Sequence, residues 1–186
     1  MSTRRDTRTL IRTAAAALVL ERTPAELTVK QVAEAAGVFP NQVTHHFGSK
    51  DQLYVAAAFS RFLRDTSRLP RAVRSARTTD AFAAAITRTA LTMPSLDSVV
   101  SSLALARNNP ALQDVVSGYL RLLLSRSERF LEAETTTRGW GTAHGVRSSA
   151  KTFWTSIFGS ALAHGAGFAG ASDDIEIAAG LALTTS

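Results

Sequence analysis

The chain has 186 residues, 45% of them hydrophobic and 19% charged, and this composition is typical of a globular protein, not a disordered one. It contains no cysteine, which excludes disulfide frameworks and thiolate metal sites and fits a reducing cytoplasm. Its net charge of +6 is uneven, because residues 1–75 hold 12 Lys and Arg against 6 Asp and Glu, whereas residues 76–186 hold 9 of each. The excess positive charge of the first segment favours a partner that carries phosphates.

Apolar periodicity predicts helices along almost the whole chain and no strand of useful length, so the expected fold is all-α. A basic arm over residues 1–6 precedes a first helix at about 7–22. Two short helices follow within residues 28–47, and a fourth helix covers about 51–69, before Pro70. Beyond a basic connector at 70–79, helices are expected at about 80–92, 96–107, 110–133, 146–169 and 173–184, with a Gly- and Thr-rich loop at 135–145.

The two short helices have the pattern of a helix-turn-helix. Thr28 and Gln31 form a capping box that begins the first of them, and Gly37 fits the left-handed position just past its end. Pro40 suits the first turn of the second helix, because its φ is already set and its missing N–H costs nothing there. Val43 and Phe47 would point inward, and Ser49 with Gln52 repeats the capping pattern at the start of the fourth helix.

The stretches TVKQVAEAAGV and HFGSKDQL resemble the N-terminal DNA-binding domain of the tetracycline-repressor (TetR/AcrR) family of bacterial transcriptional regulators. The motif match covers roughly residues 5–60, and the rest is similar to the family only in length and helical pattern. The resemblance implies a three-helix DNA-binding head over residues 1–50. It also implies a six-helix body for ligand binding and dimerisation over residues 51–186, with the fourth helix linking the two.

In the family, the positions that match Thr28, Thr44, His45, His46 and Lys50 commonly contact DNA, so the resemblance implies that role here. Short polar side chains at the start of a recognition helix face base edges, where Asn or Gln can pair with adenine and a Thr methyl can touch thymine. The full set expected at the DNA comprises Arg4, Arg5, Thr28, Lys30, Phe39, Pro40, Asn41, Gln42, Thr44, His45, His46 and Lys50.

The sequence departs from the family pattern at a few of these positions. Phe39 stands where a small capping residue is usual, Asn41 replaces a frequent Gly, and Thr44 and His46 occupy positions that often hold Tyr. These changes put the usual Tyr–phosphate contacts in doubt and suggest a different operator preference. For Phe39, packing onto the first or fourth helix is favoured over a base contact, and His46 is equally open to a half-buried packing role.

The resemblance also implies a largely apolar ligand pocket in the body, although aromatic and Met residues at helical spacing are more often ordinary core. The expected pocket comprises Met93, Leu103, Arg107, Phe130, Trp154 and Phe158, and the expected dimer interface comprises Gly159, Ala163, Gly167, Ile177 and Leu181. Small residues four apart would permit close approach of two helices. Since the four His are scattered, neither a metal nor a cofactor is expected.

The resemblance implies a cytoplasmic, homodimeric transcriptional regulator, with repression favoured, that binds a palindromic operator and is released by a small apolar or amphipathic effector. The alternative is a small helical enzyme or ligand-binding protein with an incidental helix-turn-helix, but no nucleophile–base pair or carboxylate pair is evident. Residues 152–172 lack formal charges over the length of a membrane span. Their Gly, Ser and His content favours a buried interface helix over a span.

Overall fold

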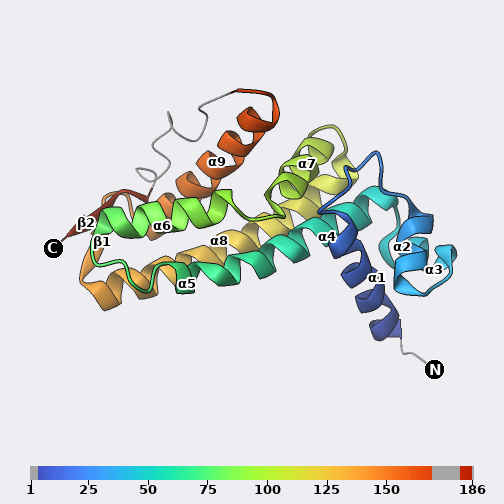
Figure 1. The fold of residues 1–186 in the computed structure, drawn as a ribbon, viewed down its shortest axis with the longest axis horizontal. Helices are drawn as coiled ribbons and strands as arrows, with labels where there is room; N and C mark the ends of the chain where they lie inside the picture. The colour runs from blue at the N-terminus through green and yellow to red at the C-terminus, as the bar shows by residue number, and fades with distance from the viewer. Residues whose placement is uncertain (1–3, 169–180, 186) are drawn as a thin grey trace. The chain divides into compact units, whose positions relative to one another are not determined.

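The structure is a computed structural model that describes residues 4–168 and 181–185, with the backbone alone at Arg4 and Arg5. The described part is α-helical apart from one two-stranded ladder, as the sequence predicts, but the expected count of three and six helices is not matched (Figure 1). In chain order the elements are α1 (Arg4–Leu18), α2 (Val29–Ala36), α3 (Pro40–Phe47), α4 (Lys50–Asp65), the 3-10 helix η1 (Thr66–Arg68), α5 (Leu69–Ala72), α6 (Thr79–Leu91), α7 (Leu96–Arg107), α8 (Pro110–Arg138), β1 (Trp140–Thr142), α9 (Val146–Gly165) and β2 (Leu183–Thr185).

The chain folds into two compact units. Unit 1 comprises residues 1–64 and 97–119, and unit 2 comprises residues 65–96 and 120–186. This division differs from the expected boundary after residue 50. The reason lies in α7 and the start of α8, whose Leu105 and Tyr119 pack against the core of unit 1.

The core of unit 1 joins the apolar faces of α1 to α4. Ile11 and Ala15 lie one turn apart on the same face of α1, and Val19 follows directly after the helix. None of the three is more than 2% exposed. They belong to one buried cluster with residues of the helix-turn-helix and α4, namely Leu27, Val32, Ala33, Val43, Phe47, Leu53 and Tyr54. Since α3 contributes to this cluster, its orientation is fixed by packing in the unit's core.

Buried hydroxyls tie α7 to the rest of unit 1. The Ser98 hydroxyl donates a hydrogen bond of 2.5 Å to the carbonyl of Val19, just past α1. Burial raises the pKa of the Tyr54 hydroxyl, although its hydrogen bonds with Ser98 and Ser101 oppose that shift. The first turns of α7 therefore hold both the end of α1 and the side of α4.

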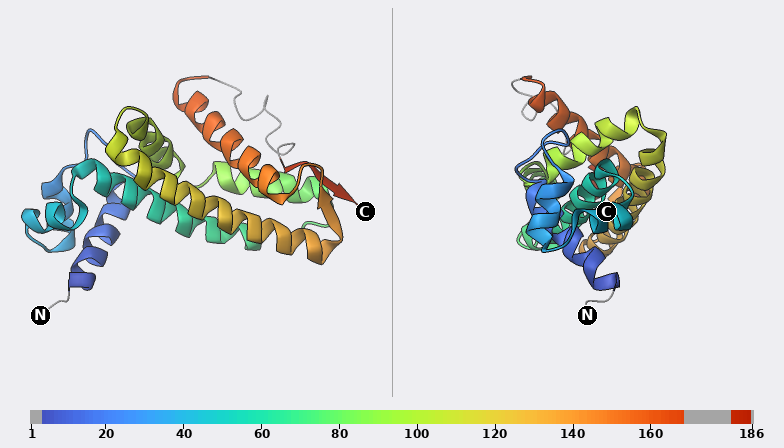
Figure 2. Two further views of the ribbon diagram at one scale, coloured as in Figure 1. Left: turned by 180° about the vertical axis from the view of Figure 1, so that it is seen from behind. Right: turned by 90° about the vertical axis from the view of Figure 1, so that its right-hand side faces the viewer.

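Unit 2 is built from α6, most of α8, and α9, and α6 lies against α9 in both ribbon views (Figures 1 and 2). Arg138, at the end of α8, donates to Glu134 at 2.9 Å, to the Val73 carbonyl at 2.9 Å and to the carbonyl of Ala76. Its guanidinium also lies 5.4 Å from the ring centre of Phe82. This one side chain thus holds the segment that follows α5 against the end of α8.

Several expected element boundaries are wrong. α1 ends at Leu18, α4 ends at Asp65 and is followed by η1 and α5, and α8 continues through the start of the expected loop as far as Arg138. At the C-terminus, Leu183–Thr185 forms strand β2 and pairs antiparallel with β1, so the end of the expected last helix is wrong. Two strands of three residues are too short to leave an alternating pattern in the sequence. The rest of that expected helix lies largely outside the described residues.

Across the described residues, no helix is both long and apolar enough to cross a membrane. The uncharged residues 152–172 start within α9, and this helix ends at Gly165.

Candidate nucleic-acid interface

The geometry of α2 and of the turn after it agrees with the helix-turn-helix pattern. The backbone N–H of Thr28 donates to Gln31 Oε1 at 2.9 Å, and the N–H of Gln31 donates back to Thr28 Oγ1 at 3.2 Å. Gly37 ends α2 with φ 65° and ψ 36°, a left-handed conformation in which a Cβ is unfavourable. These local features set where α2 begins and where the chain turns into α3.

α3 has one buried and one exposed face. Val43 and Phe47, four residues apart, are 1% and 8% exposed and pack in the core of unit 1. Asn41, Thr44 and His45 lie on the exposed side. Short polar side chains are therefore available along one side of this helix, which is the arrangement that base recognition in a major groove requires.

Gln42, by contrast, caps its own helix. Its Oε1 accepts a 3.1 Å hydrogen bond from the backbone N–H of Phe39, the residue before α3, whose own side chain cannot accept one in return. At this position the family often has a Ser. Here the Gln42 half of a capping box is present, and the half that the side chain of the preceding residue would supply is missing. Gln42 was expected to bind DNA, and its carbonyl oxygen is already engaged at the helix N-terminus.

Replacing Gln42 by Ala is therefore expected to lower the free energy of unfolding by about 1 kcal/mol, because the Phe39 N–H loses its partner. Urea denaturation followed by circular dichroism measures this change. Asn41→Ala, at the exposed neighbouring position, is the control and is expected to change stability by less than about 0.5 kcal/mol. Equal stabilities of the two variants would contradict the capping role.

The aromatic and His side chains around α3 differ from expectation in one respect. Phe39 is 76% exposed, so the favoured interpretation that it packs onto α1 or α4 is wrong. His46 is half-buried and its ring meets that of His45 edge-on, with centroids 5.4 Å apart. Phe39 thus presents an apolar surface beside the polar face of α3.

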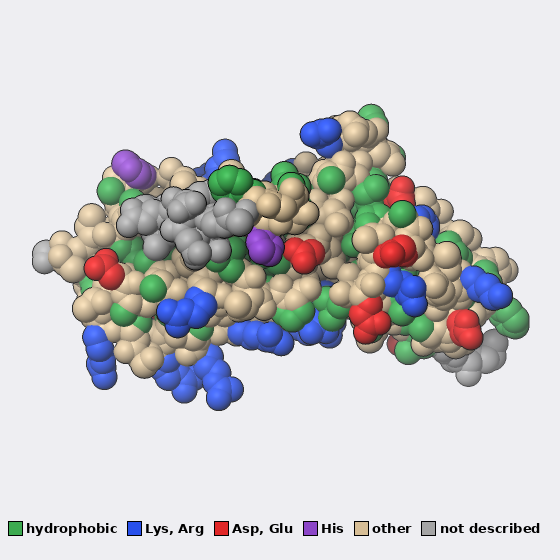
Figure 3. Space-filling model, turned by 45° about the horizontal axis from the view of Figure 1, so that its top comes forward, with side chains coloured by type: hydrophobic (Ala, Val, Ile, Leu, Met, Phe, Trp, Pro, Cys, Tyr) green, Lys and Arg blue, Asp and Glu red, His purple; other side chains and the backbone are tan. Residues whose placement is uncertain are grey.

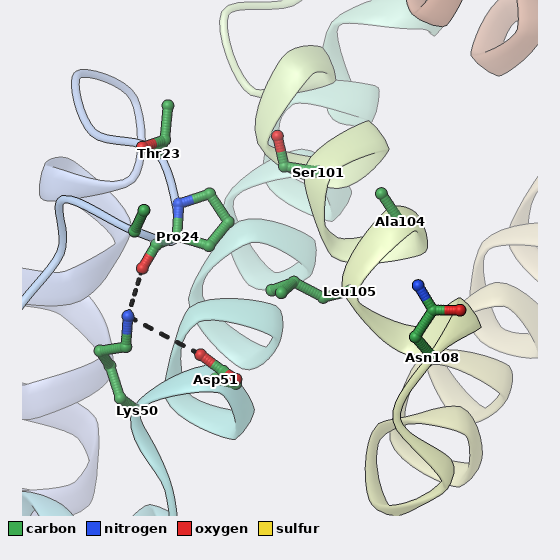
Figure 4. A pocket seen from close by; sticks show the side chains of 9 residues that line it. Thr23, Pro24, Lys50, Asp51, Ser101, Ala104, Leu105 and Asn108 are labelled. Atoms are coloured by element: carbon green, nitrogen blue, oxygen red, sulfur yellow. Dashed lines mark hydrogen bonds and ion pairs between the residues drawn. The ribbon is translucent and has the colours of Figure 1, made fainter.

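Lys50, at the start of α4, is directed toward the loop after α1. Its Nζ donates to the carbonyl of Pro24 and lies 3.9 Å from an Asp51 carboxylate oxygen (Figure 4). Both side chains are 35% exposed, so each keeps part of its surface in contact with solvent. The expected backbone contact is compatible with this position, but it was not evident from the sequence that Pro24 would hold the side chain.

Lys50 also borders a groove of about 620 Å³ in unit 1. The groove lies between the loop after α1, the N-terminus of α4 and one side of α7 (Figure 4). Its lining residues are Thr23, Pro24, Ala25, Lys50, Asp51, Ser101, Ala104, Leu105 and Asn108. No motif in the sequence pointed to this groove, because it joins segments that are far apart in the chain.

The remaining DNA-binding candidates lie at the same end of unit 1 or outside the described side chains. Thr28 and Lys30 are exposed at the N-terminal end of α2, and Pro40 is exposed at the start of α3. The side chains of Arg4 and Arg5 lie outside the described residues. Among the described residues there is no group of three or more His, Asp or Glu side chains that could hold a metal ion.

Comparison with protein families agrees with this geometry. Residues 11–57 match the model described as bacterial regulatory proteins of the tetR family, and residues 79–182 match that of the C-terminal part of a bacterial transcriptional repressor. The second match alone spans more than half of the chain. The chain belongs to the TetR family of bacterial transcriptional regulators. It is a DNA-binding transcriptional repressor of that family, whose regulators are not enzymes.

Solved structures share this TetR fold. A proposed transcriptional regulator from Rhodococcus sp. RHA1 is 30% identical, with a TM-score of 0.75 over 89% of this chain and 90% of its own. GusR from Salmonella enterica is 17% identical, with a TM-score of 0.64 over 95% of each chain. The multidrug binding protein EbrR, complexed with imidazole, is 23% identical, with a TM-score of 0.56 over 87% of this chain and 82% of its own. No curated protein matches the chain.

The expected effector residues of this TetR-family repressor are only partly brought together. Phe130 and Trp154 line a cavity in unit 2, and Phe158 stacks on Trp154 with ring centroids 5.9 Å apart. Leu103 and Arg107 lie on the part of α7 that belongs to unit 1, so they do not join this cavity. Met93 is buried between α6 and α7 but is not among the lining residues.

The cavity itself is small. Its volume is about 20 Å³, room for about one water molecule, whereas pockets for drug-sized ligands have about 300–1,000 Å³. Its lining consists of Leu69, Ile86, Ser127, Phe130, Leu131, Ala150, Phe153, Trp154 and Leu181. A ligand of ordinary effector size would have to widen it.

The expected dimer residues are divided in the same way. Gly159 is exposed and Ala163 half-buried on α9, but Gly167 lies beyond the end of that helix with φ 88°, so the three do not form one helical stripe. Leu181 is 2% exposed and lines the cavity of its own chain, so its assignment to a dimer surface is wrong. Ile177 lies outside the described residues.

The positive charge is not concentrated in unit 1. Unit 1 holds 10 Lys and Arg against 7 Asp and Glu, and unit 2 holds 11 against 8, so each carries a formal charge of +3. In Figure 3, Lys and Arg side chains lie at several separate places on the visible face. Much of the excess in residues 1–75 sits in the 3-10 and α5 segment, which the linear sequence placed next to the DNA-binding motif. Net charge therefore supports DNA binding less than the geometry of α3 does.

Proposed function

We propose that this TetR-family repressor acts in the cytoplasm as a homodimer, binds a palindromic operator through α3, and is released when a small apolar or amphipathic effector binds unit 2. The observation that carries the proposal is the division of α3 into a face buried by Val43 and Phe47 and a polar face of Asn41, Thr44 and His45. Residues 1–50 would serve DNA binding, and residues 51–186 would serve effector binding and dimerisation.

On the operator, the two copies of α3 would occupy successive major grooves about 34–36 Å apart, with the symmetry of the site matching that of the dimer. Asn41, Thr44 and His45 would contact base edges. Thr28, Lys30 and Lys50 would contact the backbone, which fixes orientation without reading sequence. Exposed Phe39 would lie against the groove wall or a thymine methyl group.

Dimerisation would use the exposed side of α9. Leu162 is 58% exposed there, Phe168 just beyond the helix is 55% exposed, and the neighbouring position Gly159 has no side chain. Large exposed apolar residues next to small ones are typical of a surface that packs against another chain. A second copy would remove these side chains from water.

The effector would act by binding two conformations of the dimer unequally. Effector binding is typical of the family, and α4 has residues in both compact units, Lys50 in unit 1 and Asp65 in unit 2. A ligand that widens the small cavity of unit 2 would favour conformers in which the two recognition helices are wrongly spaced. Its effect on DNA affinity cannot exceed its differential affinity for the two conformers.

Selection of genomic fragments by the purified full-length protein, followed by sequencing, tests the proposal. The expected result is a set of fragments that share one inverted repeat, with half-sites about one helical turn apart. Enrichment of fragments without a common inverted repeat would contradict a dimeric operator complex.

Lys50→Ala is expected to weaken binding to all duplexes about equally and to reduce the slope of log affinity against log salt by about one unit for each copy of the dimer. The reason is that Lys50 would neutralise one phosphate and read no base. Fluorescence anisotropy of an operator duplex and a scrambled duplex at several salt concentrations measures both quantities. Lys151→Ala, an exposed Lys of unit 2, is the control, and an equal slope for the two variants would remove Lys50 from the interface.

A further inference from the structure

Two buried hydroxyls in unit 2 have no hydrogen-bond partner among the described protein atoms, namely Thr87 Oγ1 on α6 and Ser149 Oγ on α9. Other hydroxyls of the same bundle donate to the carbonyl four residues earlier: Thr89 at 2.7 Å, Ser127 at 2.9 Å and Thr155 at 2.9 Å. Thr87 and Ser149 do not use this local acceptor. A buried polar group without a partner is unfavourable, so these two positions call for an explanation.

Neither hydroxyl is among the groups that line the small cavity, but Ser149 lies one turn before the lining residue Phe153, on the same side of α9. Ile86 on α6 and Ala150 on α9 line the cavity, and each is the immediate neighbour of one unpartnered residue. Ser149 is 2% exposed, so solvent does not reach it from outside. α6 and α9 are in direct contact, so separating them would open this region from both sides.

The lining of the cavity itself offers a ligand apolar contacts and no charge. Phe130, Phe153 and Trp154 supply most of the aromatic surface, and no lining residue is ionisable. Ser127 is already engaged, since it accepts from Trp154 Nε1 at 2.7 Å and donates to the Leu123 carbonyl. An unpaired charge buried here would be costly, so the buried part of a ligand must be neutral.

We propose that the effector is an uncharged, mainly aromatic or apolar molecule with at least one hydroxyl or carbonyl group, which hydrogen-bonds to Ser149, Thr87 or both. This rests on the proposed function, since it specifies the effector of that same unit. The apolar part of the molecule replaces contacts among Phe130, Phe153 and Trp154 as the cavity widens. Because the widened conformer is a minor one, apparent affinity is reduced by the fraction of protein that adopts it.

Isothermal titration calorimetry of the full-length protein with three probes of one shape, naphthalene, 2-naphthol and 2-naphthoate, tests the assignment at pH 7. We expect 2-naphthol to bind about tenfold more tightly than naphthalene, because only it can satisfy a buried hydroxyl. We expect 2-naphthoate to bind at least about tenfold more weakly than 2-naphthol, because its charge would be buried without a partner.

Two variants test which hydroxyl group is responsible for the tighter binding of 2-naphthol than of naphthalene. Ser149→Ala and Thr87→Val each remove an unpartnered hydroxyl and keep the side chain's approximate size, so both are expected to fold with undiminished stability. At least one of them should reduce the preference for 2-naphthol over naphthalene to less than about threefold, with naphthalene affinity unchanged. Ser148→Ala, at an exposed neighbouring position, should behave as the unaltered protein.

Four results would overturn the assignment: tighter binding of 2-naphthoate than of 2-naphthol, an undiminished preference in both variants, binding of none of the probes, or loss of binding in Ala104→Trp. The last variant fills the groove of unit 1 from an exposed position of α7 and should leave probe binding intact. Affinity for a DNA duplex, measured in parallel, separates the two proposals, because a protein that binds DNA but no probe contradicts only the effector class.

Discussion

Replacing Asn41, Thr44 and His45 together by Ala is expected to abolish discrimination between the operator and a scrambled duplex. Each base contact contributes about 1–3 kcal/mol of discrimination, so the loss of three in each copy of the dimer should lower operator affinity by at least about a thousandfold, to near the non-specific level. The three side chains are exposed on α3, so the variant should unfold at nearly the same denaturant concentration as the unaltered protein.

Fluorescence anisotropy with the two duplexes at one salt concentration measures the ratio of affinities. A matched control replaces the exposed polar residues Thr13 of α1 and Gln113 and Ser117 of α8, all in unit 1, by Ala. The control should keep the full ratio. If the α3 variant also kept it, the exposed face of α3 would not read the bases.

The second large effect is expected at α9. Leu162→Arg would place two guanidinium groups, one from each copy, in the proposed apolar interface without partners, which is costly. The protein should become monomeric, and because a monomer occupies only one half-site, operator affinity should fall by at least about a hundredfold. Sedimentation velocity at micromolar concentration measures the first effect, and anisotropy the second.

Ala84→Arg is the control, since it adds the same charge at an exposed position of α6 in the same unit. It should remain dimeric. Persistent dimers of Leu162→Arg would show that the interface lies elsewhere on the molecule.

The part of the site that could be predicted from the sequence is the part set by neighbouring residues. The capping box of Thr28 and Gln31 and the left-handed Gly37 depend only on backbone hydrogen bonds within a few positions, so they were predictable as a pattern. The inward direction of Val43 and Phe47 follows from helical spacing, which is equally local. Local patterns were therefore sufficient to predict the helix-turn-helix and its exposed face.

What the sequence did not reveal depends on contacts between distant segments. The packing of Leu105 and Tyr119 in unit 1 and the burial of Leu181 in unit 2 depend on how the helices associate. The exposure of Phe39 belongs here too, because an aromatic side chain at a helix start is compatible with either packing or exposure. None of these residues has a local signal that distinguishes the two outcomes.

The distribution of charge between the two units also depends on the fold and could not be predicted from the sequence. Counted along the chain, the excess of Lys and Arg lies in residues 1–75 and coincides with the DNA-binding motif. Counted by compact unit, it is shared equally, because the Arg residues after α4 belong to unit 2. Charge supports a functional assignment only when the fold shows which residues share a surface.

The central claim is that α3 of each copy lies in a major groove of the operator. Dimethyl sulfate footprinting tests it directly, since the reagent methylates guanine N7 in the major groove and adenine N3 in the minor groove. We expect protection of guanine N7 in both half-sites, lost when Asn41, Thr44 and His45 are replaced by Ala. Protection confined to adenine N3, or N7 protection that persists in that variant, would contradict it.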